Sequence, residues 1–585
     1  MADCPINSAS ETIADFIYRN GSQQQFPGNS EDIPCMDFVS TDFSIIYTPL
    51  DTVEPISLSK FTYYSIPGLY TLLDSSSMDA SGILATHASP ALSNQGRGVI
   101  IGIIDTGIDY TNPLFRNQDG TTRILSIWDQ SLPEDKSLLP AGVPNRYNAS
   151  GASYGTEYTQ EQINEALESD NPFAVVPSTD TNGHGTFLAG IAAGGILPNQ
   201  DFTGAAPECE LVIVKLKPAK QYLRDFYLIS NDADAYQEND IMMGIKYLRV
   251  EAYSQRKPLV ILLGIGSNLG SHEGTSPLNV MIQDISRYLG MATVIAAGNE
   301  TGRGHHYMGS VPIGEESVEV EIRVGNAESQ RGFVVELWAD TADTYSVGFV
   351  SPSGESIGRI PIIGRNETSI PFLLEPTVIT VNYQLIETGA GKQLVFIRFE
   401  APTNGIWRIR VYNTQYLTGQ FNMWLPAHTL ISDETVFLTP SPYTTITLPG
   451  DSTSPITVGA YNHLNNSIYI HSGRGYTIGG LIKPDLAAPG VNVSGPSIGQ
   501  RNQDSIPMTT RTGTSVAAAH VAGAVANLLS WGIIEGHNIA MSEATVKAFL
   551  IRGAKRNPAL SYPNREWGYG ALNLYETFLR LREIR

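Results

Sequence analysis

The sequence predicts a doubly wound α/β fold with a mostly parallel sheet and helices on both faces, interrupted by an inserted all-β domain. Continuous apolar runs of strand length alternate with helix-like stretches, as expected for parallel strands buried on both faces. A later stretch instead alternates apolar and polar residues with period two, which indicates antiparallel strands. With 585 residues, 42% of them hydrophobic and 16% charged, the protein is large enough to bury more than one core.

The parallel strands are expected at GVIIGII, LVIVKL, LVILLGIG and ATVIAAGN, which begin at residues 98, 211, 259 and 292. Helix-like stretches begin at His184 and Asp240, between these runs. In a doubly wound sheet, functional side chains gather at the carboxyl ends of the strands. The α/β pattern stops near residue 310 and returns at SPITVGAYN, residues 454–462.

The all-β insertion is predicted from segments such as SVEVEIRVG, residues 317–325, in which valine and isoleucine alternate with charged residues. Similar segments follow, separated by Gly, Pro and Asn, which is typical of a β-sandwich. Residues 1–62 are mixed in character and predict a small separate α+β unit. The expected domains are residues 1–62, an α/β domain in two parts at 63–310 and 446–585, and the insertion at 311–445.

Composition argues against several classes of partner. The formal charge of −21, from 58 acidic and 37 basic residues, repels phosphate backbones and anionic membrane surfaces, so no nucleic acid partner is expected. No run of about 18 apolar residues predicts a membrane span. The N-terminus lacks the basic start and apolar stretch of a secretory signal, so the protein is expected to be made in the cytoplasm. Cys4, Cys35 and Cys209 are few and widely spaced, which favours a reducing origin without a disulfide framework.

Three reactive side chains stand at predicted element ends: Asp105 after the first buried strand, His184 in NGHGT and Ser515 in GTS. A serine hydroxyl becomes a good nucleophile when a histidine takes its proton, and the histidine needs a carboxylate on its other nitrogen. Each residue alone could be an ordinary turn or capping residue. Together, flanked by small residues that allow close approach, they favour acyl transfer, and the helix start at Ser515 offers free N–H groups to an oxyanion.

These motifs resemble the subtilisin-like serine proteases (subtilases, peptidase family S8). The matching blocks are IIDTGID at 103–109, NGHGTFLAG at 182–190 and GTSVAAAHVAG at 513–523, and the likeness continues over FTGAAPECELVIVKL and LAAPG. The resemblance implies a subtilisin-like fold and a serine endopeptidase that cleaves peptides or proteins through an acyl-enzyme, with Asp105, His184 and Ser515 as the triad. It also explains the small residues after Ser515, because in subtilases this helix crosses the centre of the molecule.

The resemblance implies further site residues. Asn299, in VIAAGN, matches the asparagine that holds the oxyanion together with the Ser515 N–H. The substrate backbone would pair with Gly264, Ile265 and Gly266 as an added strand. Gly264 stands where the family more often has serine, which leaves the preferred residue before the cleaved bond open.

Subtilases also carry an N-terminal propeptide that the enzyme itself removes. KFTYYSIPGLY resembles the mature start of subtilisin, which implies a propeptide at 1–62, self-cleavage near Thr62 and Tyr63, and the propeptide as a bound inhibitor. Tyr64 and Leu114 fall at the places of two ligands of the usual calcium site. A hard cation such as calcium needs carboxylate or amide oxygens, and neither side chain has one. No metal is therefore expected there, and no cofactor is implied.

One subgroup matches best. GNETGRGHHYMG before the insertion, SIPGLYTLLDSSSMDASGI before the catalytic core and the acidic balance resemble the Csp germination proteases of clostridial spores. These proteases carry a jelly-roll insertion, often keep the cleaved propeptide bound, and activate the zymogen of a cortex-lytic hydrolase. The resemblance implies retention in the bacterial spore and association with other germination proteins. Two alternatives stay open: a catalytically silent pseudoprotease that acts as a binding or signalling partner, and an esterase or transferase using the same triad.

Overall fold

The computed structural model describes residues 8, 10–20, 35–72, 78–89, 92, 95–133, 154–197, 202–363, 367–499 and 505–582. Within these ranges the central sheet has nine strands, in the order β25-β24-β12-β10-β5-β8-β6-β7, with β26 beside β24. All neighbours are parallel except the edge strands β7 and β25. The strands are β5 (Ile100–Asp105), β6 (Ile124–Asp129), β7 (Thr156–Thr159), β8 (Glu210–Lys215), β10 (Leu259–Leu263), β12 (Met291–Ala296), β24 (Ile456–Asn462), β25 (Ser467–Ile468) and β26 (Leu486–Pro489).

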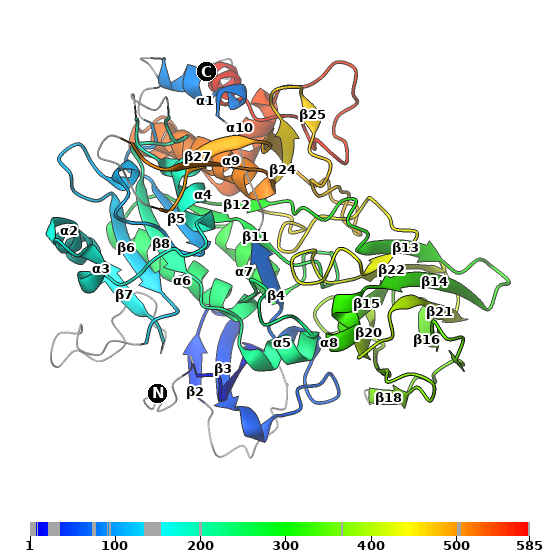
Figure 1. Cartoon of the computed structure of the whole chain (residues 1–585). Coiled ribbons are helices and arrows are strands. Elements are labelled where there is room, and N and C mark those ends of the chain that lie inside the picture. The colour runs from blue at the N-terminus through cyan, green and yellow to red at the C-terminus, as the bar shows by residue number, and fades with distance from the viewer. Residues whose placement is uncertain are drawn as a thin grey trace.

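Helices cover both faces of this sheet, which confirms the predicted doubly wound fold (Figure 1). On one face, α4 and α9 share a hydrophobic core with Ile101 and Ile103 of β5. On the other face, α6 and α7 share a core with Ile100 and Ile104 of the same strand. The helices are α1 (Ile83–His87), α2 (Gln160–Glu168), α3 (Pro172–Val175), α4 (His184–Ala193), α5 (Gln221–Tyr227), α6 (Glu238–Gln255), α7 (Pro277–Ile285), α8 (Asn326–Arg331), α9 (Thr514–Leu529), α10 (Glu543–Gly553) and α11 (Leu574–Arg582).

Helix α9 is buried along its whole length. A Cβ atom on Gly523 would lie 2.3 Å from the Cβ of Ala205 and 2.7 Å from the carbonyl oxygen of Ala192, so the neighbouring segments approach α9 to backbone contact. The segment Thr514–Ile534 is long and apolar enough to cross a membrane, but 83% of its most apolar stretch is buried inside the protein. Its composition is that of a central core helix.

The insertion consists of antiparallel strands, as its alternating pattern predicts. Over the described residues from 306 to 437, one sheet has the order β13-β22-β15-β20-β19-β18 and the other the order β17-β16-β21-β14-β23. Val320, Ile322 and Val324 of β14 are buried in a common core. The strands are β13 (His306–Ser310), β14 (Ser317–Val324), β15 (Phe333–Ala339), β16 (Thr344–Val350), β17 (Ser356–Ile357), β18 (Glu367–Pro371), β19 (Val378–Gln384), β20 (Gln393–Glu400), β21 (Gly405–Gln415), β22 (Gln420–Trp424) and β23 (Val436–Phe437).

The N-terminal unit packs against the helices below the central sheet in Figure 1. In the described part of residues 1–62, β1 (Ile13–Arg19), β3 (Phe43–Pro49) and β2 (Cys35–Phe38) form an antiparallel sheet. Ile13, Ile17 and Ile45 share a core with α6, and Phe16 shares one with α5.

The cysteines differ in state. Cys35 is disulfide-bonded, so the expectation of reduced cysteines is wrong for this residue. Cys209 is free and buried, and burial raises the pKa of its thiol to about 12, which keeps it protonated and unreactive.

Replacement of Gly523 by alanine tests the close packing of α9. Glycine to alanine normally stabilises a helix by about 1 kcal/mol, but here the added methyl would overlap Ala205. We expect Gly523→Ala to lower the free energy of unfolding by about 1 to 3 kcal/mol, measured by denaturant titration. Gly479→Ala, where a Cβ meets no atom within 4 Å, should change stability little. Equal stability of the two variants would contradict the packing argument.

Candidate active site

The structure brings Asp105, His184 and Ser515 together from three distant segments of the sequence. Asp105 ends β5, His184 begins α4 and Ser515 is the second residue of α9. The His184 Nδ1 lies 2.8 Å from Asp105 Oδ1, and the His184 Nε2 lies 3.2 Å from Ser515 Oγ. Since a carboxylate only accepts, Nδ1–H donates to Asp105 and Nε2 is left to accept the serine proton. The side chains of all three residues are buried.

Asp180, which the sequence analysis did not single out, holds the loop that carries His184. Its carboxylate accepts hydrogen bonds from the Thr106 hydroxyl, the Gly183 N–H and both the N–H and hydroxyl of Thr186. It therefore caps the start of α4 and ties it to the turn after β5. The signal available in the sequence is an aspartate shortly before NGHGT.

Gly264 lies close to Asp105 and His184, with Leu188 beside it. A Cβ atom there would lie 2.5 Å from Leu188 Cδ1 and 3.3 Å from Asp105 Oδ2. Asp105 Oδ2 is buried and has no hydrogen-bond partner among the described residues. A serine at this position, as the family more often has, would face that oxygen, and the Leu188 methyl would have to shift to make room for it.

Asn299 lies in the turn after β12, next to the start of α9. Its Oδ1 accepts from the N–H (3.1 Å) and the hydroxyl (3.2 Å) of Thr514, and the Gly298 N–H donates to the same hydroxyl at 3.1 Å. Because Oδ1 is occupied in this way, the amide NH2 of Asn299 is the group left for a ligand. The backbone N–H groups in the first turn of α9 are the other hydrogen-bond donors available to an oxyanion beside Ser515.

The segment expected to bind substrate is already paired with a strand of the same protein. β4 (Leu69–Leu72) lies between β11 (Ile265–Gly266) and β9 (Tyr236–Gln237) and is antiparallel to both. Ile265 pairs with Leu72 and Gly266 with Thr71. This is the position of an added strand, the mode by which an extended peptide binds a sheet edge.

Thr62 and Tyr63, the expected cleavage point, lie before this strand. Tyr63 begins a short 3-10 turn and is buried, and its hydroxyl donates to Glu336 Oε1 at 2.6 Å. Burial raises the pKa of Glu336 to about 7. The structure therefore ties Tyr63 to strand β15 of the insertion, whereas the segment paired with β11 is Leu69–Leu72.

Tyr64 and Leu114, at the places of two ligands of the usual calcium site, have other contacts in this structure. The Tyr64 hydroxyl donates to Ser271 Oγ at 3.1 Å, and Leu114 is buried in the core. In the described ranges, no group of three or more His, Cys, Asp or Glu residues is arranged to hold a metal ion.

Known proteins resemble this chain in sequence and in overall structure. The sequence pattern of the subtilase family (peptidase family S8) matches residues 96–353 and 439–570, together more than half of the chain. The solved structure of the Clostridium perfringens CspB protease is 31% identical, with a TM-score of 0.74, over 87% of this chain and 99% of that one.

Curated relatives match over shorter regions. The subtilisin-like protease SBT3.10 of Arabidopsis thaliana is 30% identical over 138 residues, 23% of this chain and 18% of that protein. The PII-type proteinase of Lacticaseibacillus paracasei is 24% identical over 266 residues, 45% of this chain and 12% of that protein. The matched parts thus span less than a fifth of each of these two relatives. The family pattern, which takes in Asp105, His184 and Ser515, shows that the chain belongs to the subtilase family.

Proposed function

We propose that the protein is a serine endopeptidase. Ser515 attacks a peptide carbonyl, and His184 takes the serine proton and then gives it to the leaving amine, which yields an acyl-enzyme that water hydrolyses. Asp105 orients the imidazole and stabilises its charged form. Asn299 and the Ser515 N–H stabilise the oxyanion. The observation that carries the proposal is the hydrogen-bonded line from Asp105 through His184 to Ser515, at 2.8 and 3.2 Å.

We further propose that the enzyme cleaves itself at the peptide bond that follows Leu72. β4 pairs with β11 and β9 as a substrate strand would, and Leu72 is its last residue. Cleavage at Thr62 and Tyr63, as expected from the sequence, fits this arrangement less well, because Tyr63 is bound to Glu336 of the insertion. The N-terminal product would then extend beyond residue 62 and include β4.

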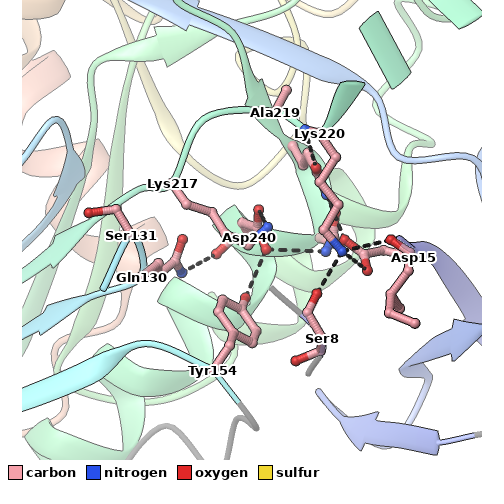
Figure 2. Close-up of polar contacts among 12 residues, drawn as sticks. Ser8, Asp15, Gln130, Ser131, Tyr154, Lys217, Ala219, Lys220 and Asp240 are labelled. Atoms are coloured by element: carbon pink, nitrogen blue, oxygen red, sulfur yellow. Dashed lines mark hydrogen bonds and ion pairs between the residues drawn. The ribbon is translucent and has the colours of Figure 1, made fainter. Parts of the chain in front are cut away.

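The N-terminal unit is suited to remain bound as an inhibitor. Lys220, at the start of α5, donates to the carbonyl oxygens of Ser8 (2.6 Å) and Ile13 (2.9 Å) and to Asp15 Oδ1 (2.7 Å). The side chains of Lys220 and Asp15 are each 1% exposed. The Gln237 amide, from β9, donates to Asp15 Oδ2 at 2.8 Å. Figure 2 shows the Lys220 amine between Ser8 and Asp15. The N-terminal unit is thereby bonded to the strand that flanks β4.

For the biological role, we propose activation of a protein zymogen, such as the precursor of a spore cortex-lytic enzyme, in the bacterial spore and together with other germination proteins. This rests on the resemblance of the protein to the Csp germination proteases and on its likeness to the CspB protease over 99% of that structure.

The second candidate is a catalytically silent pseudoprotease that acts as a binding or signalling partner in germination. One observation favours it: Ser515 is 0% exposed and the substrate edge is filled by the protein's own strand β4. A protein that kept this strand in place would have no open site.

Ser515→Ala separates the two candidates. We expect the purified parent protein to be cleaved after Leu72 and the variant to stay intact, because alanine has no hydroxyl to attack the carbonyl. Intact mass measurement of both proteins gives the position of the cut, and Ser254→Ala, at an exposed serine, should behave as the parent. A cut after Thr62 would instead support the boundary predicted from the sequence. An uncut parent protein would favour the pseudoprotease.

Asn299→Ala is expected to slow the labelling of Ser515 by a fluorophosphonate about 10²- to 10³-fold, the usual cost of one lost oxyanion donor. The rate is measured on self-cleaved protein from which the N-terminal fragment has been released. Asn465→Ala, on the surface, serves as the control. An unchanged rate in Asn299→Ala would remove Asn299 from the oxyanion site.

Lys220→Ala is expected to release the N-terminal fragment after self-cleavage. Removing the lysine leaves Asp15 buried without its charged partner, which costs about 3 to 5 kcal/mol for a buried pair. Size-exclusion chromatography of the cleaved protein measures how much fragment stays bound. Lys555→Ala, at an exposed lysine, should retain the fragment. Full retention in Lys220→Ala would show that the apolar contacts of β1 and β3 suffice.

A further inference from the structure

Glu300, the residue after Asn299, is held by two histidines. Its Oε2 lies 3.0 Å from His305 Nδ1, and its Oε1 lies 2.7 Å from His428 Nδ1. The backbone N–H of His428 also donates to both carboxylate oxygens, at 3.2 and 3.3 Å. Glu300 is 2% exposed. Burial alone would raise its pKa, but the hydrogen bonds from His305 and His428 outweigh burial and lower the pKa, so Glu300 is ionised.

Of the two histidines that contact Glu300, His428 comes from the inserted β domain. His428 lies in the loop between β22 and β23, and His305 directly precedes β13. The same loop also contacts the segment after β11, because the Leu425 carbonyl accepts from the Asn268 amide at 2.9 Å. Asn268 lies two residues after β11. One loop of the insertion therefore contacts both the segment that follows β11 and the turn that carries Asn299.

The catalytic domain also holds this turn. Gly298 and Asn299 are bonded to Thr514. The Thr301 hydroxyl donates to the Ser472 carbonyl at 2.7 Å, and His471 Nδ1 donates to the Thr301 carbonyl at 2.8 Å. Glu300, next to Asn299, is thus a residue through which the insertion holds this turn.

We propose that His428 is a positioning residue for the oxyanion site: through Glu300, the inserted β domain holds the Asn299 amide where the transition state needs it. This inference rests on the proposed protease function. A buried carboxylate that loses a donor must find another one or shift toward water. Glu300 adjoins Asn299 in a tight turn, so such a shift moves the amide, and a misplacement of about 1 Å can cost about 100-fold in rate.

The test uses the full-length protein and the first-order rate of its self-cleavage during cell-free synthesis, a rate that involves no substrate binding step. We expect His428→Ala to slow cleavage about 10- to 100-fold. His428→Asn should recover most of the rate, because its amide nitrogen can take the place of Nδ1. His428→Gln should stay slow, because its nitrogen falls nearer the place of Nε2. His537→Ala, at a histidine bonded to Trp531 beyond the far end of α9, is the matched control and should cleave as the parent.

A double-mutant cycle separates positioning from general stability. If His428 acts through Asn299, then His428→Ala should add less than about threefold to the slowing already caused by Asn299→Ala. Thermal unfolding of each variant reports on the fold. Should His428→Ala unfold, the comparison of His428→Asn with His428→Gln still decides, and equal rates for those two would overturn the inference. A parent-like rate in His428→Ala, or fully multiplicative effects with Asn299→Ala, would overturn it as well.

The protease function and the positioning role of His428 can be refuted separately. A parent protein that neither cleaves itself nor reacts at Ser515 with a fluorophosphonate would refute the protease function and this inference together. An active parent with His428 variants of equal rate would refute the role of His428 alone.

Discussion

The close approach of α9 to its neighbours is the constraint on which the rest of the site depends. Gly523 leaves no room for a larger residue against Ala205 and the Ala192 carbonyl, so α9 and α4 are fixed relative to one another. Because His184 begins α4 and Ser515 lies in the first turn of α9, that packing also sets the separation between imidazole and hydroxyl. The strand end at Asp105 completes the line. The packing of α9 against α4 therefore also determines the geometry of the candidate active site.

Buried polar contacts join the three parts of the protein. Lys220 and Asp15 connect the catalytic domain to the N-terminal unit. Tyr63 and Glu336 connect the segment after that unit to the insertion, and Glu300 connects the catalytic domain to the insertion through His428. Such contacts add little net stability, but breaking one partner is costly. They thus favour one relative arrangement of the parts over others that apolar packing alone would allow.

The position of β4 relates the regulation of the enzyme to its chemistry. This strand pairs with β11 and β9, and the buried Ser515 lies in a site that the folded protein itself covers. In the proposed protease, the first substrate is then this strand, and access for any other substrate requires its release. The Asp15 contact with Gln237 of β9 makes that release depend on the N-terminal unit.

The sequence by itself determined the fold class and singled out Asp105, His184 and Ser515, because these leave local patterns. Apolar runs mark the buried strands, period-two alternation marks the insertion, and small residues around Asp105, His184 and Ser515 mark the places where backbones approach closely. The same holds for Asn299, which follows a recognisable strand. Only the tertiary structure decided which segment pairs with β11, that Asp180 caps the loop of His184, and that Glu300 is bonded to His428. These contacts join residues far apart in the sequence, and a buried carboxylate or an added strand has no periodicity that would reveal its partner before the protein is folded.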